Sequence, residues 1–177
     1  MSILAVGGLV HLLEEPVYTQ EYSEFDKRDY VVCKIKAEVK NGERADKSFQ
    51  IQVKGVAPVY REEEILNIEI ISSQDAYVRI FWFNKEEGEQ ILPNQIQQEH
   101  FISKDTKFSF PDSDLYELVM EKKDKTAATE HNTFMVIATK KDYPFFEDEV
   151  SFKTLLNWIY NIPAYDRCAY YETFYIK

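Results

Sequence analysis

The chain has 177 residues, enough for one domain or two small ones, and it is 45% hydrophobic and 15% aromatic. This composition can supply a sizeable core and excludes collagen-like, low-complexity and mainly disordered chains. With 21 basic and 31 acidic residues, the formal net charge is −10. We therefore expect no nucleic-acid partner, because phosphate-backbone binding needs clustered lysines and arginines. No apolar run is long enough to predict a transmembrane segment.

The most apolar segment lies near the start of the chain, over residues 3–13. No basic residue precedes it and no small-residue cleavage site follows, so it favours an opening β-strand over a signal peptide. A cytoplasmic protein and the mature portion of a longer exported protein both stay open. Cys33 and Cys168 each lie in a predicted strand. We expect two buried thiols, while a disulfide between them would require an oxidising compartment.

Strict alternation of apolar and polar residues predicts two early strands, over 31–39 and 49–53, with a turn-rich segment between them. We expect them to form an antiparallel hairpin at about 30–54. A two-residue turn at Asn41-Gly42 would set apolar side chains opposite polar ones. An odd-length loop or a bulge sets Ile35 opposite Ile51 instead, and burial of one face favours that register.

Further along the chain, residues 77–83 and 134–138 are apolar on both faces, apart from Arg79 in the first of them. Such runs are typical of central strands that are covered on two sides. At 151–161, apolar residues recur at helical spacing behind Ser151, a favoured N-cap residue, and Pro163 ends the pattern.

These patterns predict a mainly β protein. We expect an antiparallel β-sandwich of about nine strands, with one C-terminal α-helix at about 151–161 before the last strand. Residues 1–62 would hold N-terminal strands that pack on the sandwich or form part of it, and residues 63–177 a β-rich domain. The side chains expected in the core are Ile35, Ile51, Ile80, Trp82, Val136, Ile137 and Leu156.

Motifs for catalysis, metal binding and cofactor binding give no match in this sequence. The three histidines are far apart, the five glycines form no phosphate-binding loop, and both cysteines lie inside strand patterns. We therefore name no catalytic residue, no metal ligand and no cofactor. The many acidic residues leave open a pair of carboxylates acting on a glycosidic bond, because their separation in space decides that chemistry.

Three aromatic residues lie just outside the strand patterns, in the segment Tyr-Pro-Phe-Phe at 143–146. A connection between a strand and a helix usually runs over the surface, and Pro144 restricts its backbone. The aromatic side chains either lie under the helix or are displayed as anchors of the kind that dominate interfaces. We name Tyr143, Phe145 and Phe146 as candidate partner-binding residues and expect at most one of them to be substantially exposed.

A longer motif points to a known family. The stretch DAYVRIFWF at 75–83, a turn at Gly88 and then ILPN at 91–94 resemble the family of domains of unknown function numbered 4384. The stretches FSFP at 108–111 and YEL at 116–118 fit the downstream strands of that family.

The end of the chain is similar to the tail of one bacterial branch of the family, in KKDYPFF at 140–146 and in the helix pattern at 155–159. The resemblance covers roughly residues 63–177. One position departs from it, because family members often place a glycine before the glutamate that corresponds to Glu117, where this chain has Tyr116.

The resemblance implies a β-rich accessory domain, often carried by exported proteins or lipoproteins of Gram-negative bacteria, without established catalytic residues. It therefore favours the mature portion of a periplasmic or lipoprotein-type protein. Our first hypothesis is a non-enzymatic module of the cell envelope that binds a protein or glycan partner. The second is a hydrolase acting on an envelope carbohydrate through paired carboxylates. The third is a structural domain that positions a neighbour.

Overall fold

The structure is a computed structural model, and it describes residues 8–12, 17–23, 27–34, 36–41, 44–84, 87–146 and 149–177. The chain divides into two units, Met1–Arg44 and Ala45–Lys177. In the smaller unit, β1 (Gly8–Leu12) pairs with β4 (Ala37–Asn41), and β2 (Val17–Ser23) pairs with β3 (Arg28–Lys34). Both pairings are antiparallel.

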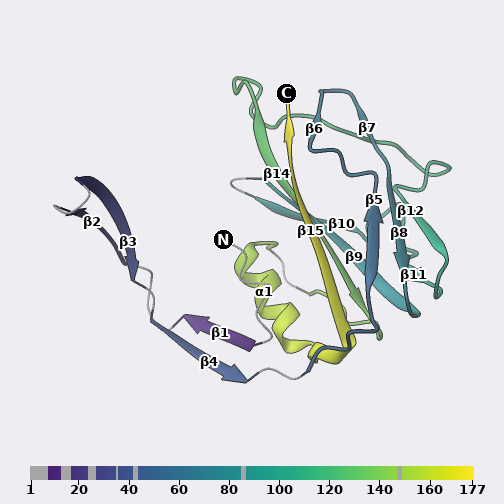
Figure 1. The fold of residues 1–177 in the computed structure, drawn as a ribbon. Coiled ribbons are helices and arrows are strands. Elements are labelled where there is room, and N and C mark those ends of the chain that lie inside the picture. The colour runs from purple at the N-terminus through teal and green to yellow at the C-terminus, as the bar shows by residue number, and fades with distance from the viewer. Residues whose placement is uncertain are drawn as a thin grey trace. The chain divides into compact units, whose positions relative to one another are not determined.

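The larger unit is built on one main sheet (Figure 1). Its members are β6 (Val59–Tyr60), β9 (Ala76–Phe83), β10 (Gly88–Leu92), β11 (Phe101–Ile102), β14 (Glu130–Thr139) and β15 (Arg167–Ile176). They follow the order β10-β9-β14-β15-β6, and β11 also pairs with β9. All these pairings are antiparallel except that of β6 with β15. The strands β9 and β14 are therefore interior, as their continuous apolar runs predict.

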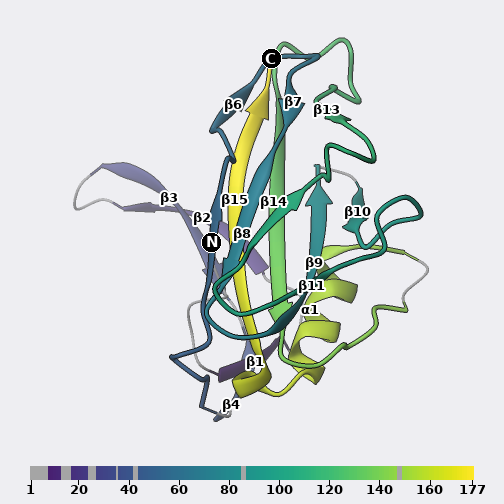
Figure 2. The same cartoon turned by 90° about the vertical axis from the view of Figure 1, so that its right-hand side faces the viewer.

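A second sheet faces the main one, with the order β12-β8-β5. Its strands are β5 (Ile51–Lys54), β8 (Ile68–Ser72) and β12 (Lys107–Phe110), and a further pair joins β7 (Ile65–Leu66) to β13 (Leu118–Val119). Figure 2 looks onto this side, where β8 crosses in front of β14 and β15.

The main core lies between the two sheets. Side chains at even positions of β9 and β14 point into it, because successive residues of a strand face opposite ways. This core cluster includes Val78, Ile80 and Val136 from the main sheet and Ile68 and Ile70 from the second, all fully buried.

The opposite face of the main sheet is covered by the helix α1 (Phe152–Asn161), as Figure 1 shows. Its N-cap is Ser151, whose Oγ accepts a hydrogen bond from the backbone N–H of Thr154 at 3.2 Å, while Thr154 Oγ1 accepts from the Ser151 N–H at 2.8 Å. The helix ends at Asn161, before Ile162 and Pro163. The predicted helix and its cap are therefore confirmed. Within the described residues, no helix has both the length and the apolar character that crossing a bilayer requires.

The predicted fold class is confirmed: the described part of the chain is mainly β, with antiparallel sheets and one α-helix before the last strand. The described residues form 15 strands where the alternation pattern predicted about nine. Several of the additional strands contain two residues, and a segment that short shows no period that alternation could detect.

The predicted hairpin at about 30–54 is wrong. The strand β4 pairs with β1, and β5 pairs with β8, so that Ile51 lies opposite Ser72. The other half of the expected pair, Ile35, lies outside the described residues. Alternation identified these strands but carried no information about their partners. Asp46, near the start of the larger unit, fixes the backbone just before β5. Its carboxylate accepts from Ser48 N at 2.9 Å and from Lys140 Nζ at 2.6 Å.

The expected core was partly correct. Ile80, Val136 and Ile137 are buried, whereas Ile51, Trp82 and Leu156 are half-buried. In α1 the buried positions are Leu155 and Ile159. The apolar stripe of the helix is wide enough to include both leucines, and only the direction in which the helix packs on the sheet decides which of them is covered.

Candidate functional site

The segment 143–146, which we call the aromatic segment, crosses between the end of β14 and the start of α1. Two hydrogen bonds fix its first half. Tyr143 Oη donates to Asp166 Oδ2 at 2.8 Å, and Trp158 Nε1 donates to the backbone oxygen of Pro144 at 3.0 Å. Donation to the Asp166 carboxylate raises the pKa of Tyr143 to about 12, so the phenol keeps its proton and continues to donate at neutral pH.

The next side chain turns inward. The ring of Phe145 packs edge-on against Phe81 of β9, at 5.2 Å between centroids, and against Trp158 of α1, at 5.6 Å. Edge-to-face aromatic contacts of this kind add stabilisation beyond the area that they bury. Phe145 is therefore an internal link between the main sheet and the helix.

Phe146 differs from its neighbours, because its side chain is 85% exposed. Tyr143 and Phe145 are half-buried. The expectation that at most one of the three aromatic residues is substantially exposed is therefore confirmed, and Phe146 is that residue. The proposal that these side chains bind a partner stays a prediction.

A buried arginine lies beside this segment. The side chain of Arg79 is 7% exposed, and its Nη2 donates to Asp142 Oδ1 at 2.8 Å. The same oxygen lies 3.4 Å from Nε2 of His100, whose Nδ1 lies 2.8 Å from the Gln98 carbonyl oxygen. Within the described structure, Nε and Nη1 of Arg79 have no hydrogen-bond partner. Asp142 therefore supplies the carboxylate that compensates a buried charge.

Sequence reasoning did not assign this role to Arg79 and Asp142, although one signal was visible. Arg79 was the single charged residue in an otherwise apolar central strand. A buried arginine needs a carboxylate partner, but the sequence offers many acidic residues from which to choose. Arg79 and Asp142 are 63 positions apart in the sequence. Their ion pair joins the residue before Tyr143 to the middle of β9. Contacts at 142, 143, 144 and 145 thus hold the backbone from which Phe146 projects.

The hydrolase hypothesis requires a pocket lined by carboxylates, and one such acidic pocket lies at one end of β9. Its lining includes Trp82, Glu87, Glu89, Glu130 and Asn132, and its volume is about 90 Å³. Ligand sites in proteins usually have volumes of about 300–1,000 Å³, so this pocket is small for a sugar ring and its neighbours.

Two carboxylates of that pocket are also engaged. Both oxygens of Glu130 accept hydrogen bonds, Oε1 from Asn132 Nδ2 at 3.2 Å and Oε2 from the Lys123 N–H at 2.8 Å. Lys123 Nζ donates to Glu87 at 2.7 Å and lowers the pKa of that carboxyl group. A general acid in glycoside hydrolysis needs a raised pKa. The pocket therefore offers little support to a hydrolase.

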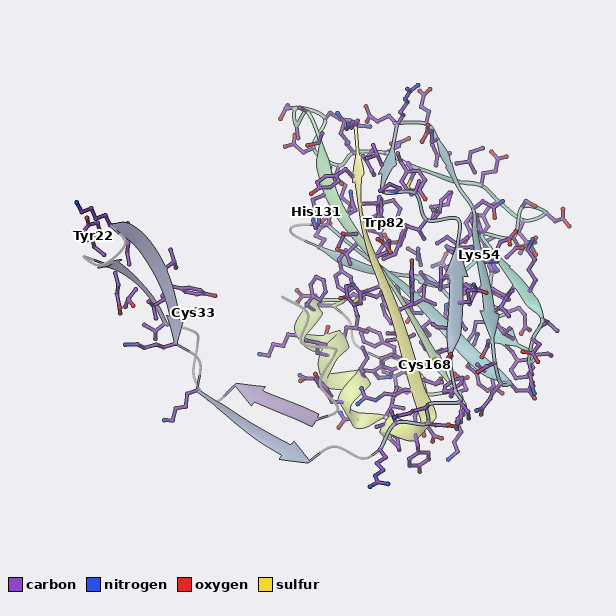
Figure 3. All side chains as sticks on the ribbon, viewed as in Figure 1. Tyr22, Cys33, Lys54, Trp82, His131 and Cys168 are labelled. Atoms are coloured by element: carbon purple, nitrogen blue, oxygen red, sulfur yellow. The ribbon has the colours of Figure 1, made fainter. Side chains whose placement is uncertain are left out.

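The two cysteines differ from expectation (Figure 3). Both thiols are free, with Cys33 exposed on β3 and Cys168 half-buried on β15. The prediction of two buried thiols is therefore wrong for Cys33, which lies on the ladder of β2 and β3, where Tyr18, Tyr22 and Val31 are exposed as well. Burial raises the pKa of Cys168 to about 12, which leaves very little thiolate at neutral pH.

We expect the two thiols to be alkylated at very different rates. Iodoacetamide at pH 8 should modify Cys33 within minutes, while Cys168 should react only after a denaturant is added, because the thiolate is the reactive form. Mass spectrometry of peptides from timed samples measures both rates. A Cys33→Ser variant is the control and should remain unmodified under native conditions; rapid labelling of that variant would contradict the expected protection of Cys168.

Comparison with known proteins gives one family match. Residues 59–142 match the model of a family described as Domain of unknown function (DUF4384). The resemblance seen in the sequence is confirmed over that range, which begins at β6 and ends at Asp142. The aromatic segment and α1 lie outside it. Comparison with curated proteins found none that matches the chain. Among the described residues, no group of three or more histidine, cysteine or acidic side chains is arranged to hold a metal ion.

Proposed function

Taking residues 59–142 as a domain of the DUF4384 family, we propose that the chain is a non-enzymatic interaction module of the bacterial cell envelope, which binds a protein or glycan partner through Phe146. The envelope location follows from the family resemblance. The binding role follows from the way in which the larger unit presents one aromatic side chain.

The observation that carries this proposal is the 85% exposure of Phe146 on a backbone that is held at several points. Tyr143, Pro144 and Phe145 each make a specific contact with α1 or the residues next to it. A large apolar ring on such a support loses little conformational entropy on binding, because its backbone is already ordered. Aromatic residues, phenylalanine included, are enriched in the cores of protein interfaces.

The two other hypotheses have less support. The acidic pocket is small for a sugar ring and its neighbours, so it gives a hydrolase little support. A purely structural role gives no reason for a phenylalanine to be exposed at the end of the aromatic segment, whose backbone is held by hydrogen bonds and packing. The experiment must therefore separate binding at Phe146 from non-specific exposure of aromatic surface.

The test places a photoreactive phenylalanine analogue at position 146 of the full chain, produced in the bacterium that encodes it. We expect one dominant cross-linked species, identified by mass spectrometry. The matched control carries the analogue at Tyr165, which is also exposed and aromatic, and should give no such species.

Once a partner is identified, Phe146→Ala should weaken its binding by about 2 kcal/mol, roughly thirtyfold, as expected for a hot-spot ring. Unchanged affinity, or equal cross-linking at positions 146 and 165, would overturn the proposal. Release of reducing sugar from purified envelope polysaccharide by the protein would favour the hydrolase instead.

A further inference from the structure

The ladder of β2 and β3, in the smaller unit, contains only two strands. In the described part of the chain, β2 pairs with β3 alone, over seven consecutive positions. A two-stranded ladder is at best marginally stable in water, and a strand added to its edge supplies backbone hydrogen bonds that the isolated pair lacks. Each edge of this ladder is therefore a place where a further strand can pair.

The two edges differ in their protection against such pairing. Edge strands of natural proteins commonly carry a lysine, a proline or a bulge. The strand β3 ends with the exposed Lys34. In contrast, β2 contains no lysine, arginine or proline, and its register with β3 runs without a bulge. The outer edge of β2 is therefore the one that is open to another strand.

The sequence of β2 is complementary to itself in one antiparallel register. When two copies are placed side by side about a two-fold axis at Gln20, Tyr18 of one copy lies opposite Tyr22 of the other, and Thr19 lies opposite Glu21. Gln20 then faces Gln20, and no charged residue is directly opposite another. Aromatic side chains opposite each other on antiparallel strands have Cβ atoms about 4.5–5.5 Å apart, and such pairs stabilise a sheet.

The side chains that this register uses are accessible. Tyr18 is 66% exposed and Tyr22 is 60% exposed, and Gln20 is exposed as well. Figure 3 labels Tyr22 and Cys33 on this hairpin. Because Gln20 pairs with Val31 and Tyr18 with Cys33, the two tyrosines share one face of the ladder with exposed Val31. Pairing of two β2 strands therefore removes aromatic surface from water on that face.

We propose that the outer edge of β2 binds a second copy of this chain. The two β2 strands pair antiparallel about Gln20 and form a four-stranded sheet, in the order β3-β2-β2-β3, across two copies. The choice of a second copy follows from the symmetry of the register, since β2 itself supplies a tyrosine at both matching positions and an uncharged residue at the centre. The contact uses the same surface of both copies, so it closes as a dimer.

The first test places charges at the position that faces itself. Sedimentation equilibrium of the full chain, from about 5 μM to about 500 μM, should show a monomer–dimer equilibrium, because an interface of seven residues a side is small and weak. Gln20→Lys alone and Gln20→Glu alone should each weaken dimerisation at least fivefold, since like charges then lie directly opposite. An equimolar mixture of the two variants should dimerise at least as tightly as the unmodified protein.

The matched controls make the same charge changes at Gln52, an exposed residue of β5 in the larger unit. Gln52→Lys and Gln52→Glu should leave dimerisation within twofold, and so should Phe146→Ala. A chain that stays monomeric throughout would overturn the proposal. So would equal weakening at positions 20 and 52, or a mixture of Gln20 variants that fails to restore association. Loss of the dimer in Phe146→Ala would assign self-association to the aromatic segment instead.

The second test detects the register directly. Opposite Cα atoms of antiparallel strands are about 4.5 or 5.5 Å apart, and both distances allow a disulfide. In a Cys33→Ser background, Gln20→Cys should therefore form a covalent dimer under mild oxidation by oxidised glutathione, whereas Gln52→Cys should not. Non-reducing electrophoresis measures the yield, and circular dichroism confirms that each variant keeps its fold. Equal yields at the two positions, or none at position 20, would contradict pairing through β2.

Discussion

Leu155→Ala is expected to lower the free energy of unfolding by about 2–5 kcal/mol, whereas Leu156→Ala should cost roughly 1 kcal/mol. The two residues are adjacent in α1 and identical in chemistry, but Leu155 is fully buried and Leu156 is half-buried. Removing a buried leucine side chain loses the free energy gained when that side chain was transferred out of water. It also leaves a cavity, because the surrounding structure relaxes only in part.

Urea denaturation followed by tryptophan fluorescence measures both variants, and Trp158 on the same helix serves as a reporter of its packing. The midpoint should fall for Leu155→Ala with an unchanged slope, which would show that stability and not compactness has changed. Equal losses for the two variants would mean that α1 packs in a different rotation about its axis.

Asp142→Ala is expected to cost about 3 kcal/mol, because it leaves the buried guanidinium of Arg79 without its carboxylate. Removing one partner of a buried ion pair typically costs about 3–5 kcal/mol, and the 47% exposure of Asp142 places this case near the lower end. Replacing the arginine instead, in Arg79→Met, should be much less harmful, because an apolar side chain of similar length needs no partner.

The double variant Arg79→Met with Asp142→Ala completes the thermodynamic cycle, and it should be more stable than Asp142→Ala alone. The measurement is the unfolding free energy at two salt concentrations, since a buried pair is screened less than a surface pair. Additive losses in the cycle would show that the two side chains do not interact. Loss of cross-linking at position 146 in Asp142→Ala would further show that the pair supports the aromatic segment.

The candidate site was predictable in its location and not in its details. The sequence identified 143–146 as aromatic residues on a connection, and proline as its stiffening element. It did not reveal that Tyr143 contacts Asp166 or that Phe145 packs between β9 and α1. These partners come from elements distant in the chain, so the choice of Phe146 as the exposed ring depends on contacts that no local pattern contains.

The bridge between Gly88 and Val150 could not have been predicted either. Gly88 was visible only as a turn residue, and the bridge joins segments about 60 residues apart in the sequence. Nothing in either segment specifies the other as its neighbour.

What the sequence determined by itself is the class of local structure. Alternation placed the strands, continuous apolar runs marked β9 and β14 as interior, and Ser151 with Pro163 bounded the helix, because these signals arise within a few residues of backbone. The tertiary structure alone decided that β5 pairs with β8, that Leu155 and not Leu156 is buried, and that Arg79 pairs with Asp142. Such choices depend on which apolar faces and charges meet across long stretches of chain, and a local period is the same whichever partner the strand or helix finally meets.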